Sequence, residues 1–127
     1  MDKNHAIPQS EWQVMELLWQ QPRTLMQLVS ALQKTVGWSK STVNTMVRRM
    51  TEKGLIVFDT EGRTKIFRAA VDREDVVAQE TDSLLHRAYR GSIGMMLSAM
   101  VKQRRDLTKQ DIDELYAILK QAEEDAK

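Results

Sequence analysis

The chain has 127 residues, no cysteine, 19 Lys and Arg side chains against 18 Asp and Glu, and a formal net charge of +1. This length suits one ordinary domain or a small domain with an appendage, and the lack of cysteine excludes disulfide frameworks, zinc ribbons, iron–sulfur clusters and thiol nucleophiles. No stretch comes near the roughly 18 consecutive apolar residues of a membrane helix, and the polar first residues do not resemble a signal peptide, so we expect a cytoplasmic protein with no membrane partner.

Three helices are predicted in the first half of the chain, each introduced by a hydroxyl side chain. Ser10, followed three residues later by Gln13, has the spacing of a capping box. Thr24 and Gln27 repeat that spacing before a second helix, and Ser39 opens a third. Because the apolar side chains behind each of these positions recur at helical spacing, the pattern predicts three amphipathic helices.

Proline and glycine mark the expected ends of these helices. Pro22 is expected to stop the first helix, and Gly37 to end the second or to lie just past its end. Gly54 follows Lys53, which fits a left-handed cap with a cation in the last turn of the third helix.

The pattern changes to that of β-strands after Gly54. Residues 55–59 are short, apolar and rich in β-branched side chains, and residues 64–69 form a second short strand around Ile66 and Phe67. Glu61 and Gly62 supply a turn signal between them. The first ~70 residues therefore predict three helices followed by a β-hairpin, in a fold that is mainly α.

The rear of the chain predicts helices that have only one apolar side. Asp72 is expected to cap a fourth helix, and Thr108 with Asp111 to cap the last one. One-sided helices need a second layer, which either the first domain or the same helices of a second chain can supply. Self-association is the simpler answer, because a two-fold pairing closes. We therefore predict domains over residues 1–72 and 73–127.

The net charge hides an asymmetry between these two parts. Residues 1–72 carry ten basic and seven acidic side chains, whereas residues 73–127 carry nine basic and eleven acidic ones. A basic front half is a weak indication of nucleic-acid binding.

The third predicted helix strengthens this indication. Between Ser39 and Lys53 it carries four basic residues and one acidic residue. The face opposite its apolar stripe consists of Lys40, Ser41, Asn44, Thr45, Arg48 and Arg49. Amide and hydroxyl side chains mixed with Arg and Lys suit a helix in the major groove, because they pair with base edges and phosphates. Arg63 and Lys65 are expected at the hairpin tip, where phosphate contacts would set register.

Two other interpretations stay open at this point. A polar helix face with basic residues is often only a solvated face. A protein-interaction module without DNA binding is the alternative function, supported by Glu52, Glu61 and the acidic rear half. An enzyme is not predicted, because His5 and His86 lie far apart and no nucleophile–base set, metal site or cofactor motif occurs. The methionines at helical spacing predict packing rather than copper binding.

Two sequence motifs resemble the penicillinase-repressor family. The first is Glu11-Trp12-x-Val14-Met15-x-x-Leu18-Trp19, and the second is Trp38-Ser39-x-x-Thr42-Val43-x-Thr45-x-x-x-Arg49-Met50-x-x-Lys53-Gly54. The resemblance continues with Glu61-Gly62-Arg63 and Phe67, and with Asp106-Leu107-Thr108 and Asp111-Ile112-Asp113-Glu114-Leu115.

The resemblance implies a winged helix-turn-helix domain over residues 1–72 and a helical dimerisation domain over residues 73–127. It implies a homodimeric repressor on double-stranded operator DNA with two-fold symmetry, read by a recognition helix at 39–53 and a wing at 55–69. The predicted DNA-contacting residues are Ser39, Lys40, Ser41, Thr42, Asn44, Thr45, Arg48, Arg49, Arg63 and Lys65. The implied dimer interface uses Leu84, Leu85, Met96, Leu97, Met100, Val101, Ile112, Leu115 and Leu119.

Three departures from the family pattern matter for function. Copper-responsive relatives carry a cysteine-rich tail, and this chain as given has no cysteine. In β-lactam-responsive relatives a membrane sensor protease cuts an Asn–Phe bond, and the matching positions here are Met100 and Val101. Asn44 stands where several relatives have a basic residue. A sensor protease is therefore a further candidate partner whose cleavage site in this chain differs, and the inducing signal stays open.

Overall fold

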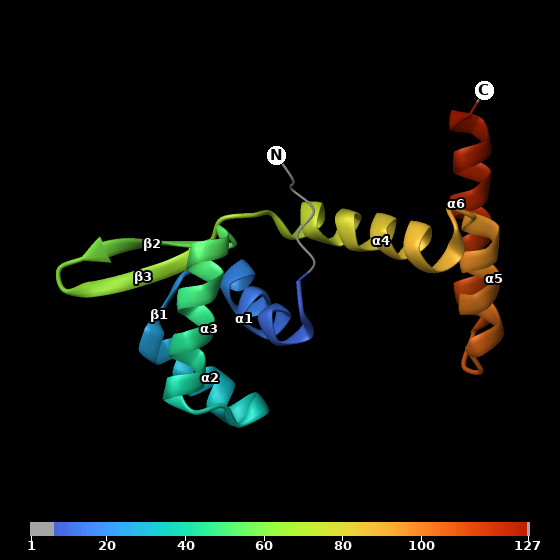
Figure 1. Ribbon diagram of the computed structural model, residues 1–127. Coiled ribbons are helices and arrows are strands. Elements are labelled where there is room, and N and C mark those ends of the chain that lie inside the picture. Colours follow the sequence, from blue (N-terminus) through green and yellow to red (C-terminus); the bar gives the residue numbers. More distant parts are fainter. Residues whose placement is uncertain (1–6, 127) are drawn as a thin grey trace. The chain divides into compact units, whose positions relative to one another are not determined.

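Six helices and a three-stranded antiparallel sheet make up residues 7–126, the part of the chain that the computed structural model describes (Figure 1). The predicted class, mainly helical with a hairpin after the third helix, is confirmed. By its contacts the chain divides into two compact units, residues 1–81 and 82–127. The functional boundary expected after residue 72 stays a prediction.

Helix α1 (Gln9–Gln20) begins earlier than predicted, so the Ser10 capping box is wrong. Pro8 is the N-cap, and its carbonyl accepts hydrogen bonds from the backbone N–H groups of Glu11 and Trp12, at 2.9 and 3.1 Å. Ser10 therefore lies inside the first turn and cannot act as the cap. At the other end Gln21 is extended before Pro22, as predicted.

Helices α2 (Leu25–Val36) and α3 (Lys40–Lys53) keep the predicted caps. In α2 the backbone N–H of Gln27 donates to Thr24 Oγ1 at 3.2 Å, and the backbone N–H of Thr24 donates to Gln27 Oε1 at 2.8 Å. In α3 the backbone N–H of Thr42 donates to Ser39 Oγ at 3.2 Å. Gly37 and Gly54 end these helices with φ of 73° and 84°, left-handed values that glycine adopts most easily.

The sheet contains one strand that the sequence did not predict. β2 (Ile56–Glu61) and β3 (Thr64–Ala69) form the expected antiparallel hairpin, with Phe58 opposite Phe67. A two-residue strand, β1 (Arg23–Thr24), pairs with β3 on its other side, so the strand order is β1-β3-β2. Two residues are too few to show alternation, and sequence patterns placed them in a connection.

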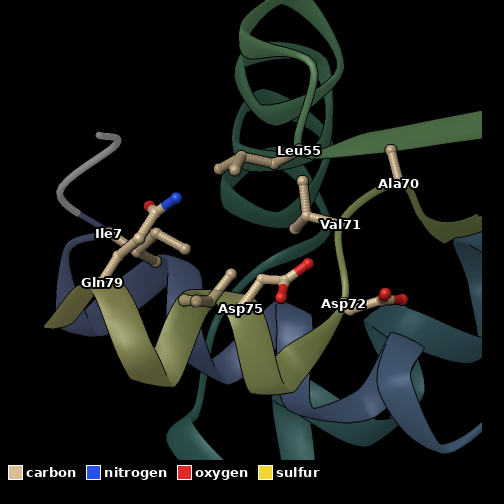
Figure 2. A pocket seen from close by; sticks show the side chains of 8 residues that line it. Ile7, Leu55, Ala70, Val71, Asp72, Asp75 and Gln79 are labelled. Carbon is tan, nitrogen blue, oxygen red and sulfur yellow. The ribbon is translucent and has the colours of Figure 1, made fainter. Parts of the chain in front are cut away.

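The first unit has a hydrophobic core that its own helices and strands enclose. Figure 1 shows α1, α2 and α3 gathered beside the base of the hairpin. Its most deeply buried side chains are Val14, Met15, Leu28, Leu32, Val43, Met50, Leu55 and Ile56. Helix α4 (Arg73–Tyr89) adds Val76 to this core. The loop after β3 and the start of α4 line a cavity of about 300 Å³ together with Ile7 and Leu55 (Figure 2).

The second unit has no comparable core. Helices α5 (Ile93–Gln103) and α6 (Lys109–Asp125) follow α4, and none of the described side chains from residue 82 onward is fully buried. The capping box of Thr108 and Asp111 is present as predicted. The chain turns between α4 and α5 at Arg90 and Gly91, which both have positive φ. Within residues 7–126 no helix has the length and apolar character needed to cross a membrane.

Candidate nucleic-acid interface

The predicted recognition face lies on the solvent side of α3. Val43, Val47 and Met50 face the core, and helical geometry turns the intervening positions outward. Of the predicted residues on this helix, Thr45 is half-buried, and Ser39, Lys40, Ser41, Thr42, Asn44, Arg48 and Arg49 are exposed. The face is therefore accessible along the whole length of the helix.

The basic side chains of this face carry unneutralised charge. Lys40, Arg48 and Arg49 form no ion pair with any other residue between 7 and 126, and the same holds for Arg63 and Lys65 in the hairpin. Three other basic residues of the first unit form ion pairs: Lys53 with Glu11, Arg68 with Asp59 and Arg73 with Glu16. Unpaired cations gathered on one surface attract a polyanion such as DNA.

Ser39 and Thr42 belong to the N-terminus of α3, and both are also exposed on its surface. Ser39 Oγ donates a hydrogen bond to Thr42 Oγ1 at 3.1 Å and accepts the backbone N–H of Thr42. These contacts give the Ser39 hydroxyl a capping role in the unbound chain, and the Thr42 hydroxyl holds it in place by accepting its hydrogen bond. The free N–H groups beside them, at the positive end of the helix dipole, suit a phosphate group.

The hairpin places one of its two predicted residues at the tip. Arg63 lies in the turn between β2 and β3, next to Gly62, whose φ is 67°. Lys65 is the second residue of β3, which has the bounds predicted for the second strand, and it lies opposite Thr60, one residue pair away from the pair next to the turn. Its ammonium group is 4.5 Å from the ring centroid of Phe58, a cation–π distance.

A groove of about 300 Å³ joins α3 to the hairpin. The residues that line it are Asn44, Val47, Arg48, Thr51, Glu52, Phe58, Lys65 and Phe67. Five of them come from α3 and three from the strands β2 and β3, so the groove brings Asn44, Arg48 and Lys65 to one surface. Glu52 is the acidic group of that lining and would repel a phosphate there.

One contact that supports this surface was missed by sequence reasoning. Glu11, on the buried side of α1, is only 4% exposed, and its Oε2 lies 2.5 Å from Lys53 Nζ in the last turn of α3. Its other oxygen, Oε1, is buried without a hydrogen-bond partner among the described residues. The pair attaches the end of the recognition helix to α1. An acidic residue within an apolar helix face was the available signal.

The predicted dimer residues lie on exposed or half-exposed helix surfaces of the second unit. Met96, Leu97, Met100, Leu115 and Leu119 line one almost wholly apolar groove between α5 and α6, together with Ile93 and Ile118. Met100 is 54% exposed and Leu119 51%. Val101 lines the adjoining groove, whereas Leu84, Leu85 and Ile112 lie outside both. Large apolar side chains that are this exposed indicate a surface that lacks a packing partner among the described residues.

No metal-ligating cluster is present among residues 7–126. His5 lies outside the described residues. In α4, His86 Nδ1 lies 2.9 Å from the backbone oxygen of Asp82. Because this contact lies within one helix, it gives the imidazole a local structural role.

Comparisons with known proteins agree with this geometry. A family model described as penicillinase repressor matches residues 7–121. The penicillinase repressor of Bacillus licheniformis is 30% identical over 122 residues, which cover 95% of this chain and 94% of that protein. The methicillin resistance regulatory protein MecI of Staphylococcus aureus (strain N315) is 26% identical over 121 residues, covering 93% and 96% of the two chains.

Two solved structures are similar to part of the chain. One is the DNA-binding domain of the repressor BlaI, and the other is the Bacillus licheniformis BlaI monomeric form in complex with the blaP half-operator. Each is 30% identical, has a TM-score of 0.52, and covers 59% of this chain and 93% of its own. The likeness extends to a protein solved with operator DNA bound.

Proposed function

Because the chain belongs to the penicillinase repressor family of winged-helix transcriptional repressors, we propose that it binds a two-fold symmetric operator as a homodimer, through α3 and the β2–β3 hairpin. Family membership decides in favour of DNA binding over the interaction module, and confirms that the chain is not an enzyme. A repressor acts where its operator is, so the proposed place of action is the cytoplasm.

The observation that carries the proposal is the exposed, unpaired basic face of α3 and the hairpin. Asn44 and Thr45 offer groups that pair with base edges, and Arg49 offers a guanidinium for a guanine or a phosphate. Ser39, Lys40, Ser41 and Thr42 lie at the helix start, where phosphate contacts fix the docking angle. Arg48, Arg63 and Lys65 are proposed to contact the backbone from the groove and the wing.

The proposed interface is tested by titrating the full chain onto duplex DNA from the region upstream of its own gene. Binding should weaken as salt rises, by about 0.9 in the log–log slope for each neutralised phosphate. Arg49→Ala should weaken binding without moving the thermal midpoint much, whereas Lys34→Ala, on α2, should change neither. A flat salt dependence, or equal binding to any duplex, would contradict operator recognition.

The homodimer is supported by the exposed apolar surface of the second unit. Two copies that cover the α5–α6 grooves would bury Met100, Leu119 and their neighbours, which in one chain remain about half in water. A dimer that links two DNA-binding domains in this way raises the effective concentration at which the second domain meets its half-site. Sedimentation of the full chain at micromolar concentration tests the dimer, and a monomer mass would contradict it.

A sensor protease stays a proposed partner. The Met100–Val101 bond, which matches the cleavage position of β-lactam-responsive relatives, lies within α5 and near its end at Gln103. Proteases act on extended chain, so we propose that cleavage there needs the last turn of α5 to open. Limited proteolysis followed by mass determination tests this: cuts confined to residues 104–108 between the helices would contradict it.

A further inference from the structure

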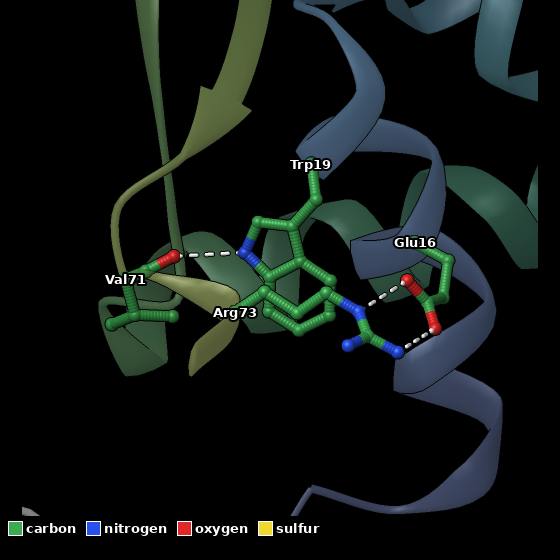
Figure 3. A network of polar contacts seen from close by, with 4 residues as sticks. All are labelled: Glu16, Trp19, Val71 and Arg73. Carbon is green, nitrogen blue, oxygen red and sulfur yellow. Dashed lines mark hydrogen bonds and ion pairs between the residues drawn. The ribbon is translucent and has the colours of Figure 1, made fainter. Parts of the chain in front are cut away.

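Four residues attach the start of α4 to α1 within the first unit (Figure 3). Trp19 Nε1 donates a hydrogen bond to the backbone oxygen of Val71 at 2.9 Å, across 52 residues of sequence. Arg73 Nε donates to Glu16 Oε1 and Arg73 Nη2 to Glu16 Oε2, both at 3.1 Å. We call Glu16, Trp19, Val71 and Arg73 the α1–α4 clamp.

The geometry of the clamp restricts the orientation of the Arg73 side chain as well as its position. Two parallel N–H···O bonds between a guanidinium and a carboxylate hold both planes in one orientation, and Figure 3 shows the two groups facing each other along the side of α1. The Arg73 guanidinium carbon lies 5.8 Å from the Trp19 ring centroid, within cation–π reach. The hydrogen bond from Arg73 lowers the pKa of the Glu16 carboxyl and holds it in its charged form.

Burial adds a further attachment just beyond the clamp. Val76, one turn into α4, is 6% exposed and packs in the core with the side chains of α1 and α3. The main chain of residue 71, the side chain of residue 73 and the side chain of residue 76 are thus all held by the first unit. Residue 71 lies just before α4, and residues 73 and 76 lie in its first turn. Because a helix is stiff along its axis, these three neighbouring attachments set the direction in which α4 leaves that unit.

This direction bears on how a dimer reads DNA. The same unit holds α3, and α4 runs on to Tyr89, past the boundary at which the contacts divide the chain. Resting on the proposed homodimer, we propose that Glu16, Trp19 and Arg73 are positioning residues that restrict the distance between the two operator half-sites the protein accepts. They would do so without touching DNA, by limiting the angles that each recognition helix adopts relative to α4.

A selection experiment with the full chain tests the role of the clamp. Wild type, Glu16→Gln and Arg73→Gln are each used to select duplexes from a library with a randomised centre, and half-site sequence and half-site spacing are scored separately. Both altered side chains are about half exposed, so the fold should persist in each variant. Lys109→Gln, which removes an exposed 3.4 Å ion pair to Asp113 on α6, serves as the control.

We expect wild type and the control to select one half-site sequence at a narrow spacing. The two clamp variants should select the same half-site at a broader spacing, and the roughly tenfold affinity lost on a wrongly spaced duplex should shrink to about threefold or less. An unchanged narrow spacing in both variants would overturn the role of the clamp, and so would loss of the half-site sequence itself. Failure of wild type to select paired half-sites would overturn the proposed dimeric binding instead.

Discussion

The two units of this chain differ in how far their apolar side chains are buried. In the first unit, helices α1 to α3, the sheet and the start of α4 enclose a set of fully buried residues such as Met15, Leu28 and Met50. In the second unit no described side chain is fully buried, and Met100 and Leu119 remain about half exposed. Hydrophobic burial drives folding. The first unit therefore holds its stability within one chain, whereas the second needs a further surface.

The largest effect is expected in the closed core. Leu28→Ala removes a fully buried side chain of α2 and should lower the free energy of unfolding by about 2–5 kcal/mol, measured by urea denaturation of the full chain. Met26→Ala, on the exposed side of the same helix, is the control and should cost less than about 1 kcal/mol. Similar losses for both would show that the first unit is not the closed core described.

The buried carboxylate of the first unit should give the next largest effect. Lys53→Met leaves the buried Glu11 carboxyl without its partner, and should destabilise the chain by about 2–3 kcal/mol. Glu11→Gln should cost less, because Lys53 is 45% exposed and water can replace its partner. Thermal unfolding of both variants, with Lys34→Met in the last turn of α2 as control, measures the asymmetry. A larger loss of stability in Glu11→Gln than in Lys53→Met would contradict this role of the ion pair.

An acidic side chain in the apolar groove of the second unit should act on association. Leu119→Asp places a charge where two copies would meet, and should weaken dimerisation by about tenfold to a hundredfold in sedimentation equilibrium. The unfolding of the first unit should stay unchanged, since Leu119 contributes nothing to its core. Ala117→Asp, on the exposed opposite side of α6, is the control. A dimer unaffected by Leu119→Asp would place the interface elsewhere.

The smallest effect concerns pH and the α1–α4 clamp. The pKa of Glu16 is lowered in the folded chain by the hydrogen bond from Arg73, so the ion pair stabilises the fold at neutral pH, above the ordinary carboxyl pKa. That stabilisation should be lost as the pH falls below about 4 and the carboxyl takes up its proton. Wild type should therefore be slightly more stable than Glu16→Gln at pH 7, and the difference should vanish in acid. A constant difference would contradict the ion pair.

The features predicted from sequence are those made by residues close together in the chain. Thr24 with Gln27, Ser39 with Thr42 and Thr108 with Asp111 form their caps within one helical turn, so their spacing alone identified them. Gly37 and Gly54 ended helices for an equally local reason, their left-handed backbone. The exposed face of α3 followed from periodicity once its apolar stripe was known. Ser10 failed because Pro8 competed for the same helix start.

Tertiary structure decided what depends on residues far apart in the chain. The pairing of Arg23 and Thr24 with β3, the contact between Glu11 and Lys53, and the clamp between α1 and α4 each join segments more than forty residues apart. No spacing rule reaches that far, because which helix face meets which strand is settled by packing of the whole unit. The sequence by itself determined the helices, the hairpin, the charged face and the family. Only the folded chain decided which carboxylate is buried, that the Lys65 ammonium group lies over the Phe58 ring, and which residues hold the start of α4.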